Sequence, residues 1–419
     1  MAEGFDAWEH ENAEVRRTRK FSRMCAMLEA GYGASSRLRR ILDETGLMPA
    51  DFSRDLDLER LPVISRETLI QWELSEPPYG GLADPAADVD RIFISPGPVY
   101  EPHLSEADML WARAYHAAGI GKADRVLNAF SYHLVAAGLT FHGGLRRVGA
   151  TVVPSGTAGA QNQVELIRDL GITAYTGTPS FLMAIIRKAE EMGYDWEKDF
   201  RLKRACFAAE PLRPALRETF TRDYGIDTYQ MYGATEVGDV AYECRQKSGW
   251  HICEEVFVEI CDPESGRRLP AGELGQVVVT RFNDIFFLMR FGTGDLSRLI
   301  ETPCDCGRTA YRLDGIAGRV GEAVKVRGMF VAPSQIHRLA QRFSGKIFRV
   351  HVRREGDRDL LVVRIEGAPG TQGDGWAGDE EFKRGFRDLC TVGVDRLEWV
   401  PKGTLAAADR QLVDERDWR

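Results

Sequence analysis

The sequence lacks the features that would place a protein in a membrane or outside the cell. No stretch of its 419 residues approaches the roughly 18 consecutive apolar residues that a membrane-spanning helix needs. The N-terminal segment carries charges throughout and has no apolar core of the kind found in secretory signals. We therefore expect a cytoplasmic protein with no membrane partner.

An excess of basic residues is also missing. The chain has 55 Lys and Arg against 63 Asp and Glu, a formal net charge of -8. Because affinity for nucleic acid usually rests on a basic face, we expect no nucleic-acid partner. Cysteines are few: the eight present suit a reducing compartment, where thiols stay free unless a metal binds them.

The length of the chain predicts more than one domain, since one ordinary hydrophobic core does not serve so many residues. We expect a large N-terminal domain over residues 1–317, which includes a β-rich subdomain at about residues 244–317. Residues 318–419 then form a C-terminal lid domain, because a segment of roughly 100 residues can fold independently.

Helical and strand patterns alternate between Glu101 and Met231, which is typical of a parallel sheet covered by helices. Residues 172–176 resemble a buried strand, and Thr178 with Pro179 can cap the helix that follows. Ligands usually bind beyond the carboxyl ends of such strands. The pattern therefore predicts a doubly wound sheet with a ligand site at one edge.

After Glu243 short strands separated by turns predominate, with examples at Val256–Cys261 and Gln276–Arg281. The predicted fold class is α/β. It consists of a large N-terminal domain with doubly wound sheets plus a β-rich subdomain, and a small mobile α+β C-terminal domain.

The segment MYGATE ends at Glu236 and combines residue types that suit a nucleotide site. Tyr232 offers a flat face to a purine and Gly233 permits close approach of the backbone. Thr235 can contact phosphate, and Glu236 can bind Mg²⁺. The alternative interpretation is a turn at a strand end with a packed tyrosine. Further along, Asp295 follows a Gly-Thr-Gly turn and could accept both hydroxyls of a ribose.

Four more motifs accompany these two in a fixed order: AAEP before them, and CDCGR, AGR and PSQI after them. Together the six motifs resemble the phenylacetate-CoA ligase branch of the AMP-forming adenylate-forming (acyl-CoA synthetase) superfamily. The resemblance extends from about Asp90 to the end of the chain.

The resemblance implies a two-step reaction. A carboxylic acid, by default an aryl or arylacetic one, reacts with ATP to give an acyl-adenylate, and the thiol of CoA then takes the acyl group. Mg²⁺ is the expected metal cofactor and a homodimer the expected assembly. Two alternatives stay open: a catalytically degenerate nucleotide-binding homologue, and an adenylating enzyme that uses an acceptor other than CoA.

The resemblance also implies a role for each matching residue. Nucleotide and CoA would contact Ser95, Ala209, Glu210, Pro211, Tyr232, Gly233, Asp295, Arg319, Lys325 and Arg327. Gly321 would be the hinge of the small domain, and Thr235 and Glu236 would serve catalysis. Tyr132, Val135, Phe141 and Thr178 would border the acyl pocket, although most apolar residues in such helices belong to the core.

Two segments depart from the family pattern. The family's phosphate loop resembles SSGTTGKP, whereas this chain has SPGPVYEP, with Glu101 in place of the lysine. The family's C-terminal catalytic lysine is also unmatched; Arg410 could replace its charge, and Lys402 lies close in sequence. An arginine fork and a lysine differ in geometry, so the replacement is not equivalent.

Cys244, His251, Cys304 and Cys306 form a candidate zinc site, with Cys253 as a replacement ligand. Structural zinc favours four nitrogen and sulfur ligands. Here the ion would hold the β-rich segments together and take no part in catalysis. The alternative is a set of ordinary reduced cysteines beside a surface histidine.

Overall fold

In the computed structural model the chain divides into two compact units, Met1–Val320 and Gly321–Arg419. The structure describes residues 4–95, 97–273, 275–320, 324–327, 329–331, 333–343, 346–367, 378–390, 392–405 and 411–416. Gly321 and Arg410 lie outside these residues. Within them, no helix has both the length and the apolar character needed to cross a membrane.

A nine-stranded sheet forms the centre of the larger unit, in the order β13-β14-β9-β8-β7-β6-β5-β3-β4. Its strands are β3 (Arg125–Asn128), β4 (Thr151–Val153), β5 (Ala174–Gly177), β6 (Arg204–Phe207), β7 (Asp227–Ala234), β8 (Gly238–Glu243), β9 (Trp250–Ile252), β13 (Leu299–Ile300) and β14 (Arg312–Leu313). The five strands from β7 to β4 are parallel to one another. The other four run antiparallel to their neighbours.

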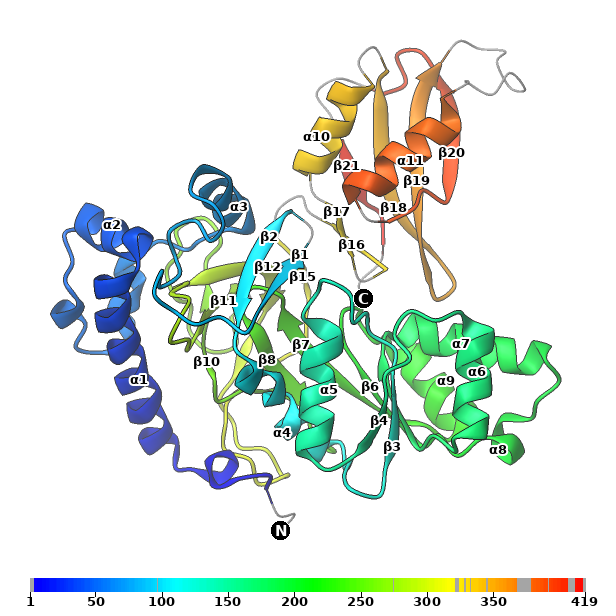
Figure 1. Cartoon of the computed structure of the whole chain (residues 1–419), viewed down its shortest axis with the longest axis horizontal. Coiled ribbons are helices and arrows are strands. Elements are labelled where there is room, and N and C mark those ends of the chain that lie inside the picture. The colour runs from blue at the N-terminus through cyan, green and yellow to red at the C-terminus, as the bar shows by residue number, and fades with distance from the viewer. Residues whose placement is uncertain are drawn as a thin grey trace. The chain divides into compact units, whose positions relative to one another are not determined.

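Helices cover both faces of the parallel strands (Figure 1). They are α4 (Ala112–Ala117), α5 (Ala137–Arg147), α6 (Ala160–Asp169), α7 (Pro179–Glu191), α8 (Trp196–Asp199) and α9 (Pro214–Tyr224). Trp111 and Phe141 belong to one core beside α4 and α5, whereas Ile167, Ile185 and Phe220 belong to a second core on the other face. The sheet is therefore doubly wound, as predicted. Since the helices after β3 and β5 lie on opposite faces, a ligand crevice is expected at the carboxyl ends of these two strands.

Local sequence signals explain where these elements begin and end. Thr178 accepts a hydrogen bond from the N–H of Phe181, and Pro179 is the first residue of α7, as predicted. Gly225 ends α9 in the left-handed conformation, with φ of 60°. The strand predicted at residues 172–176 begins slightly later, at Ala174.

A second, four-stranded antiparallel sheet has the order β10-β11-β12-β15. Its strands are β10 (Val256–Cys261), β11 (Gly275–Arg281), β12 (Phe291–Ser297) and β15 (Gly318–Arg319). The predicted β-rich stretch at about residues 244–317 is thus divided between two sheets, because β9, β13 and β14 extend the larger one. A separate hairpin joins β1 (Arg91–Ser95) to β2 (Val99–His103).

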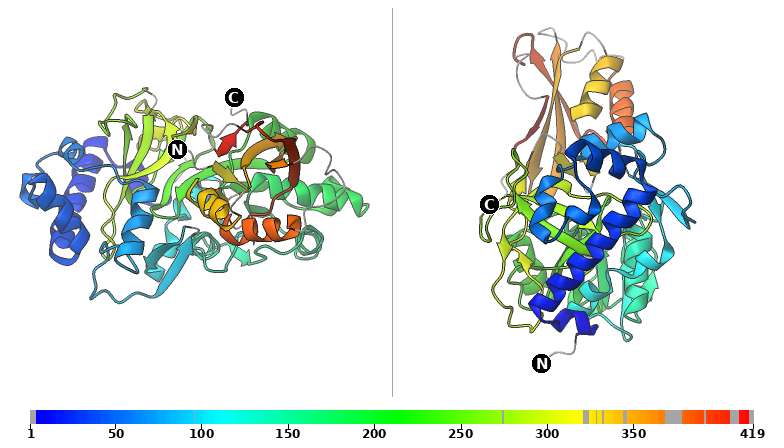
Figure 2. Two further views of the ribbon diagram at one scale, coloured as in Figure 1. Left: turned by 90° about the horizontal axis from the view of Figure 1, so that it is seen from above. Right: turned by 90° about the vertical axis from the view of Figure 1, so that its left-hand side faces the viewer.

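Several helices precede the hairpin of β1 and β2, and two of them, α1 and α2, lie at one end of the larger unit (Figure 2). The helices are η1 (Ala7–His10), α1 (Ala13–Ala34), α2 (Ser36–Thr45), η2 (Pro49–Asp51), η3 (Asp55–Arg60) and α3 (Arg66–Ser75), and η4 (Ser105–Met109) follows the hairpin. Met24, Leu28 and Leu38 pack there against Phe287 and Met289. The segment before α3 is thereby held close to the second sheet.

The smaller unit is α+β, in agreement with the predicted fold class. Its elements are β16 (Val324–Val326), β17 (Met329–Val331), α10 (Pro333–Arg342), β18 (Phe348–Glu355), β19 (Arg358–Gly367), α11 (Asp379–Cys390), β20 (Arg396–Pro401) and β21 (Leu412–Asp414). A four-stranded sheet has the order β20-β19-β18-β21. Its core includes Val350, Leu361 and Val363 from the sheet and Phe382 and Phe386 from α11.

Candidate functional site

Tyr232, Asp295 and Arg319 meet where the two sheets of the larger unit come together. The Tyr232 hydroxyl donates a hydrogen bond to Oδ2 of Asp295 at 2.9 Å, and it lies 3.1 Å from Oγ1 of Thr293. Asp295 and Arg319 are partners in the β12 and β15 register, and Nε of Arg319 lies 3.1 Å from Oδ1 of Asp295. The aromatic ring and the carboxylate predicted to bind one nucleotide are therefore in direct contact.

The surroundings of Tyr232 make it a hydrogen-bond donor. Burial raises the pKa of Tyr232 well above its ordinary value, and the nearby Asp295 carboxylate raises it further. The phenol therefore stays protonated and donates to the carboxylate. The side chain of Asp295 remains 17% exposed, so a ligand can still reach it from the solvent side.

Arg66, at the start of α3, connects the phosphate loop to the predicted magnesium ligand. It forms an ion pair with Oε1 of Glu236. Nη2 of Arg66 also donates to Oγ of Ser95 at 3.4 Å. Thr235 donates to the other carboxylate oxygen of Glu236 at 3.3 Å. Arg66 precedes the first recognisable motif, so no sequence pattern marked it as a site residue.

Two buried carboxyl groups lie at the hairpin of β1 and β2: Glu101 on β2 itself and Glu73 on α3. Burial raises the pKa of Glu101 to about 7, against the opposing effects of Ser95 and Arg66. Burial also raises the pKa of Glu73 to about 8, although Glu73 accepts a 2.8 Å hydrogen bond from the N–H of Tyr100. Both acids are therefore partly protonated near neutral pH.

Replacing Glu73 with Gln is expected to raise the melting temperature at pH 8 by roughly 2–6 °C and to leave it unchanged at pH 4.5. In the unfolded chain the Glu73 carboxyl group ionises near its ordinary pKa of 4.5. In the folded protein its pKa is about 8, so it ionises only near pH 8. The wild type therefore loses stability as the pH rises through this window, and a Gln side chain does not. Thermal unfolding at both pH values measures the difference.

The matched control is Glu67→Gln, which changes an exposed carboxylate on the same helix. It should not reproduce the dependence on pH. Equal melting temperatures for wild type and Glu73→Gln at pH 8 would contradict the prediction.

The predicted adenine segment follows β6, next to the end of β7. Ala209 has a positive φ of 70°, which is uncommon for a residue with a side chain. Glu210 accepts a hydrogen bond from the N–H of Ser180 at 3.4 Å, and Pro211 is partly buried. A Cβ on Gly233 would lie only 2.4 Å from the carbonyl oxygen of Gly238, so this strand end accommodates no side chain there.

The residues predicted to border the acyl pocket lie near the ends of β3 and β5. The hydroxyl of Tyr132 is 3.1 Å from Nδ1 of His142, and burial raises the pKa of Tyr132 to about 12. Thr178 caps α7, and Val135 is half-buried. Phe141 is buried in the hydrophobic core. Their contact with an acyl group stays a prediction.

Two further predicted residues lie in the smaller unit. Lys325 is on β16, opposite Phe330 in the register with β17. Nη1 of Arg327 lies 3.0 Å from Oδ1 of Asp395 in an ion pair within that unit. Contact of either residue with CoA stays a prediction, as do the roles of Gly321 and Arg410.

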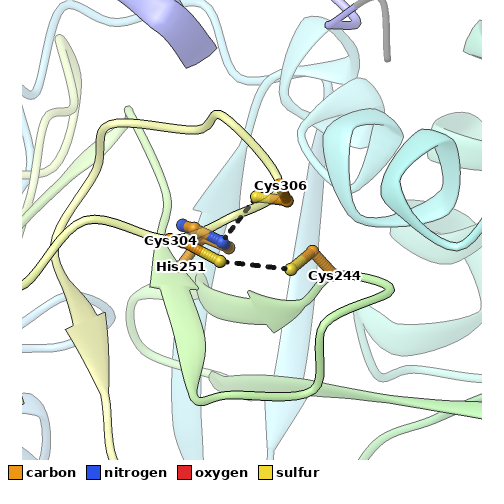
Figure 3. Close-up of side chains that lie close together, drawn as sticks. All are labelled: Cys244, His251, Cys304 and Cys306. Atoms are coloured by element: carbon orange, nitrogen blue, oxygen red, sulfur yellow. Dashed lines mark hydrogen bonds between the residues drawn. The ribbon is translucent and has the colours of Figure 1, made fainter. Parts of the chain in front are cut away.

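Cys244, His251, Cys304 and Cys306 form a compact buried cluster (Figure 3). One ligand atom from each residue lies within 4.8 Å of the others. The Sγ atoms of Cys244 and Cys304 are 3.8 Å apart, and Sγ of Cys306 is 3.4 Å from Nε2 of His251. Cys253, the proposed replacement, is not part of this cluster.

These separations fit tetrahedral zinc. With bonds of about 2.3 Å to sulfur and 2.0 Å to nitrogen, neighbouring ligand atoms are roughly 3.5–3.8 Å apart. Nδ1 of His251 lies 3.4 Å from the carbonyl oxygen of Ala310, which orients Nε2 toward the sulfur atoms. The N–H of Arg308 also approaches Sγ of Cys306 at 3.4 Å. The donor set suits a closed structural site.

A family model described as "AMP-binding enzyme" matches residues 103–283. The phenylacetate-coenzyme A ligase of Thermus thermophilus is 32% identical over 343 residues, which are 78% of this chain and 76% of that protein. The corresponding ligase of Pseudomonas putida is 31% identical over 376 residues, 86% of this chain and 84% of that protein. The chain belongs to the phenylacetate-coenzyme A ligase family. This makes it an AMP-forming ligase, as the motifs indicated.

The fold of this family member agrees with that of a solved ligase. A crystal structure of 2-hydroxyisobutyryl-CoA ligase, in complex with 2-HIB-AMP and CoA, gives a TM-score of 0.88 at 24% identity. The comparison covers 98% of this chain and 91% of that one. At this identity the likeness establishes the fold.

Proposed function

We propose that this family member activates an aryl or arylacetic acid with ATP and transfers the acyl group to CoA. One observation carries the proposal: Tyr232, Asp295 and Arg319, which the motifs assign to nucleotide binding, are in direct contact. The names of the similar ligases from Thermus thermophilus and Pseudomonas putida support the substrate class.

In the first step a carboxylate oxygen of the acid attacks the α-phosphorus of ATP. The bond between the α-phosphorus and the oxygen that bridges it to the β-phosphate breaks, and pyrophosphate leaves with the electron pair. Asp295 accepts hydrogen bonds from the ribose hydroxyls and thereby fixes the α-phosphate relative to the acid. In the second step the CoA thiol releases its proton to solvent and its sulfur attacks the acyl carbon. The bond from this carbon to the phosphate oxygen breaks, and AMP leaves with the electron pair.

The oxygen atoms of Glu236 and Thr235 suit Mg²⁺, which prefers carboxylates and the phosphates of a substrate. When bound, Mg²⁺ would neutralise charge on the phosphates. Glu236 is almost fully buried, with 2% of its side chain exposed. A buried carboxylate needs a positive partner both with and without bound ATP and Mg²⁺. In this structure the partner of Glu236 is Arg66.

The test is an assay of pyrophosphate release with ATP, Mg²⁺ and a panel of carboxylic acids, with and without CoA. We expect release that depends on an aryl or arylacetic acid, and formation of AMP and a thioester when CoA is present. Release without any thioester would indicate a different acceptor. No acid-dependent release across the panel would contradict the proposal.

We also propose that Cys244, His251, Cys304 and Cys306 bind one structural Zn²⁺, supported by their tetrahedral spacing and burial. Elemental analysis of protein purified without chelator should give about one zinc per chain. Zinc-free protein that is fully folded would contradict this proposal.

We further propose that the protein is cytoplasmic and forms a homodimer. The eight free cysteines suit a reducing location, and the family resemblance is the basis for the assembly. Light scattering of purified protein at several concentrations tests the dimer, and a constant monomer mass would exclude it.

A further inference from the structure

Arg66 occupies a fixed position between the phosphate loop and the nucleotide site. Ser65 caps α3 by accepting a hydrogen bond from the N–H of Thr68. The N–H of Ile64 donates to the carbonyl oxygen of Arg290, and the N–H of Gly292 donates to that of Ile64, each at 2.9 Å. These bonds attach the start of α3 to β12, the strand that carries Asp295.

The guanidinium contacts two groups that belong to the phosphate end of the site. One is Oγ of Ser95 at the end of β1, and the other is the carboxylate of Glu236. Only 14% of the Arg66 side chain is exposed. An arginine so placed presents a planar fork of donors, which matches phosphate oxygens in pairs.

One charge near Arg66 is opposite in sign to that of the family pattern, at position 101. Glu101 stands where the phosphate-loop lysine of the family would be, and it is buried on β2. Ser95 joins the two residues, because it accepts from Arg66 and also hydrogen-bonds to Glu101. Glu73 on α3 is a second buried acid. In this chain a cation on α3 therefore contacts the end of β1, and Glu101 is a buried acid nearby.

We propose that Arg66 supplies the positive charge for the ATP polyphosphate, and that Glu101 acts as its counter-ion. This rests on the proposed ATP-dependent function. When ATP enters, the guanidinium turns from Glu236 to the phosphate oxygens, and Glu236 becomes available to the magnesium ion that accompanies ATP. Arg66 is a binding and positioning residue, and Glu101 acts through it.

The decisive measurement compares ATP and AMP binding by calorimetry, with Mg²⁺ present. Arg66→Gln should weaken ATP binding by about 10- to 100-fold, the range for a lost charge-assisted hydrogen bond. AMP binding should change by less than about threefold, because AMP lacks the β- and γ-phosphates. Arg60→Gln, which alters an exposed arginine shortly before α3, is the matched control and should change neither.

Charge restoration separates this role from a purely structural one. The double variant Arg66→Gln with Glu101→Lys has its positive charge at position 101, where the family has its lysine. Its affinity for ATP should be at least about tenfold higher than that of Arg66→Gln. Arg66→Lys should retain intermediate affinity, since a lysine offers a point charge without the fork. Thermal unfolding of each variant reports whether the fold is intact.

Three results would overturn the proposal: unchanged ATP affinity in Arg66→Gln, an equal loss of ATP and AMP affinity, or no recovery in a folded double variant. Failure of the proposed function has a different signature. In that case wild-type protein binds ATP more tightly than Arg66→Gln does, yet no acid in the panel causes pyrophosphate release.

Discussion

Asp295→Asn is expected to lower kcat/KM for ATP by about 100- to 1,000-fold. The carboxylate can accept a charge-assisted hydrogen bond from each ribose hydroxyl, and each such bond contributes about 1.5–3 kcal/mol. Asparagine has no charge and only one acceptor atom, and it leaves Arg319 without its 3.1 Å ion-pair partner. Steady-state kinetics at varied ATP concentration measures the loss.

Asp284→Asn is a suitable control for this variant. Asp284 is exposed in the segment between β11 and β12, so the same chemical change occurs outside the site. Its kcat/KM should stay within about twofold of wild type, a change below 0.5 kcal/mol. If folded Asp295→Asn kept its kcat/KM for ATP within threefold of wild type, Asp295 would not be a ribose ligand.

Removal of zinc is expected to have the largest effect on stability. Replacing Cys304 and Cys306 with Ser should abolish zinc binding and lower the melting temperature by about 10 °C or more. Structural zinc contributes about 10–16 kcal/mol in small zinc peptides. Even a third of that value would shift the melting temperature of a unit this large by roughly 10 °C, at 2–4 °C per kcal/mol. Elemental analysis and thermal unfolding measure the two effects.

Cys25→Ser provides the control, because Cys25 is a partly buried thiol on α1 that lies outside the cluster. It should retain zinc and melt within about 2 °C of wild type, as expected for a change of less than 1 kcal/mol. A stable double variant with an unchanged melting temperature would show that the cluster does not hold a structural metal.

The loop that carries two members of the cysteine and histidine cluster also contacts the N-terminal helix η1. The N–H of Thr309 donates a 3.0 Å hydrogen bond to the carbonyl oxygen of Glu9. Nδ1 of His10 lies 2.8 Å from the carbonyl oxygen of Gly307. Both contacts come from the loop that carries Cys304 and Cys306. Chelation should therefore speed amide hydrogen exchange in η1 before it affects the parallel strands.

The parts of the fold that were predictable depend on local signals. Helix α7 begins where predicted, because Thr178 caps it and Pro179 is its first residue. Strand β10 matches its predicted bounds for a similar reason, since turn residues delimit a short apolar run. The division of the β-rich stretch between two sheets was not predictable, because hydrogen-bond partners far along the chain decide to which sheet a strand belongs.

The same distinction applies to the site. Tyr232, Glu236 and Asp295 belong to short motifs, so the sequence identified them. Arg66 belongs to no such motif. Its proposed role depends on contacts with Ser95 and Glu236, which are distant in sequence and adjacent only in the folded chain. A lone arginine at a helix start resembles any surface arginine until its neighbours are known.

The hairpin of β1 and β2 has a further consequence for nucleotide exchange. Its strands pair over five positions, from Arg91 with His103 to Ser95 with Val99. A glycine-rich loop would have to lose backbone freedom when the triphosphate arrives, at about 1–2 kcal/mol per residue. The paired strands of this hairpin are already ordered. If the hairpin borders the nucleotide as proposed, ATP can bind and leave without this cost in backbone entropy.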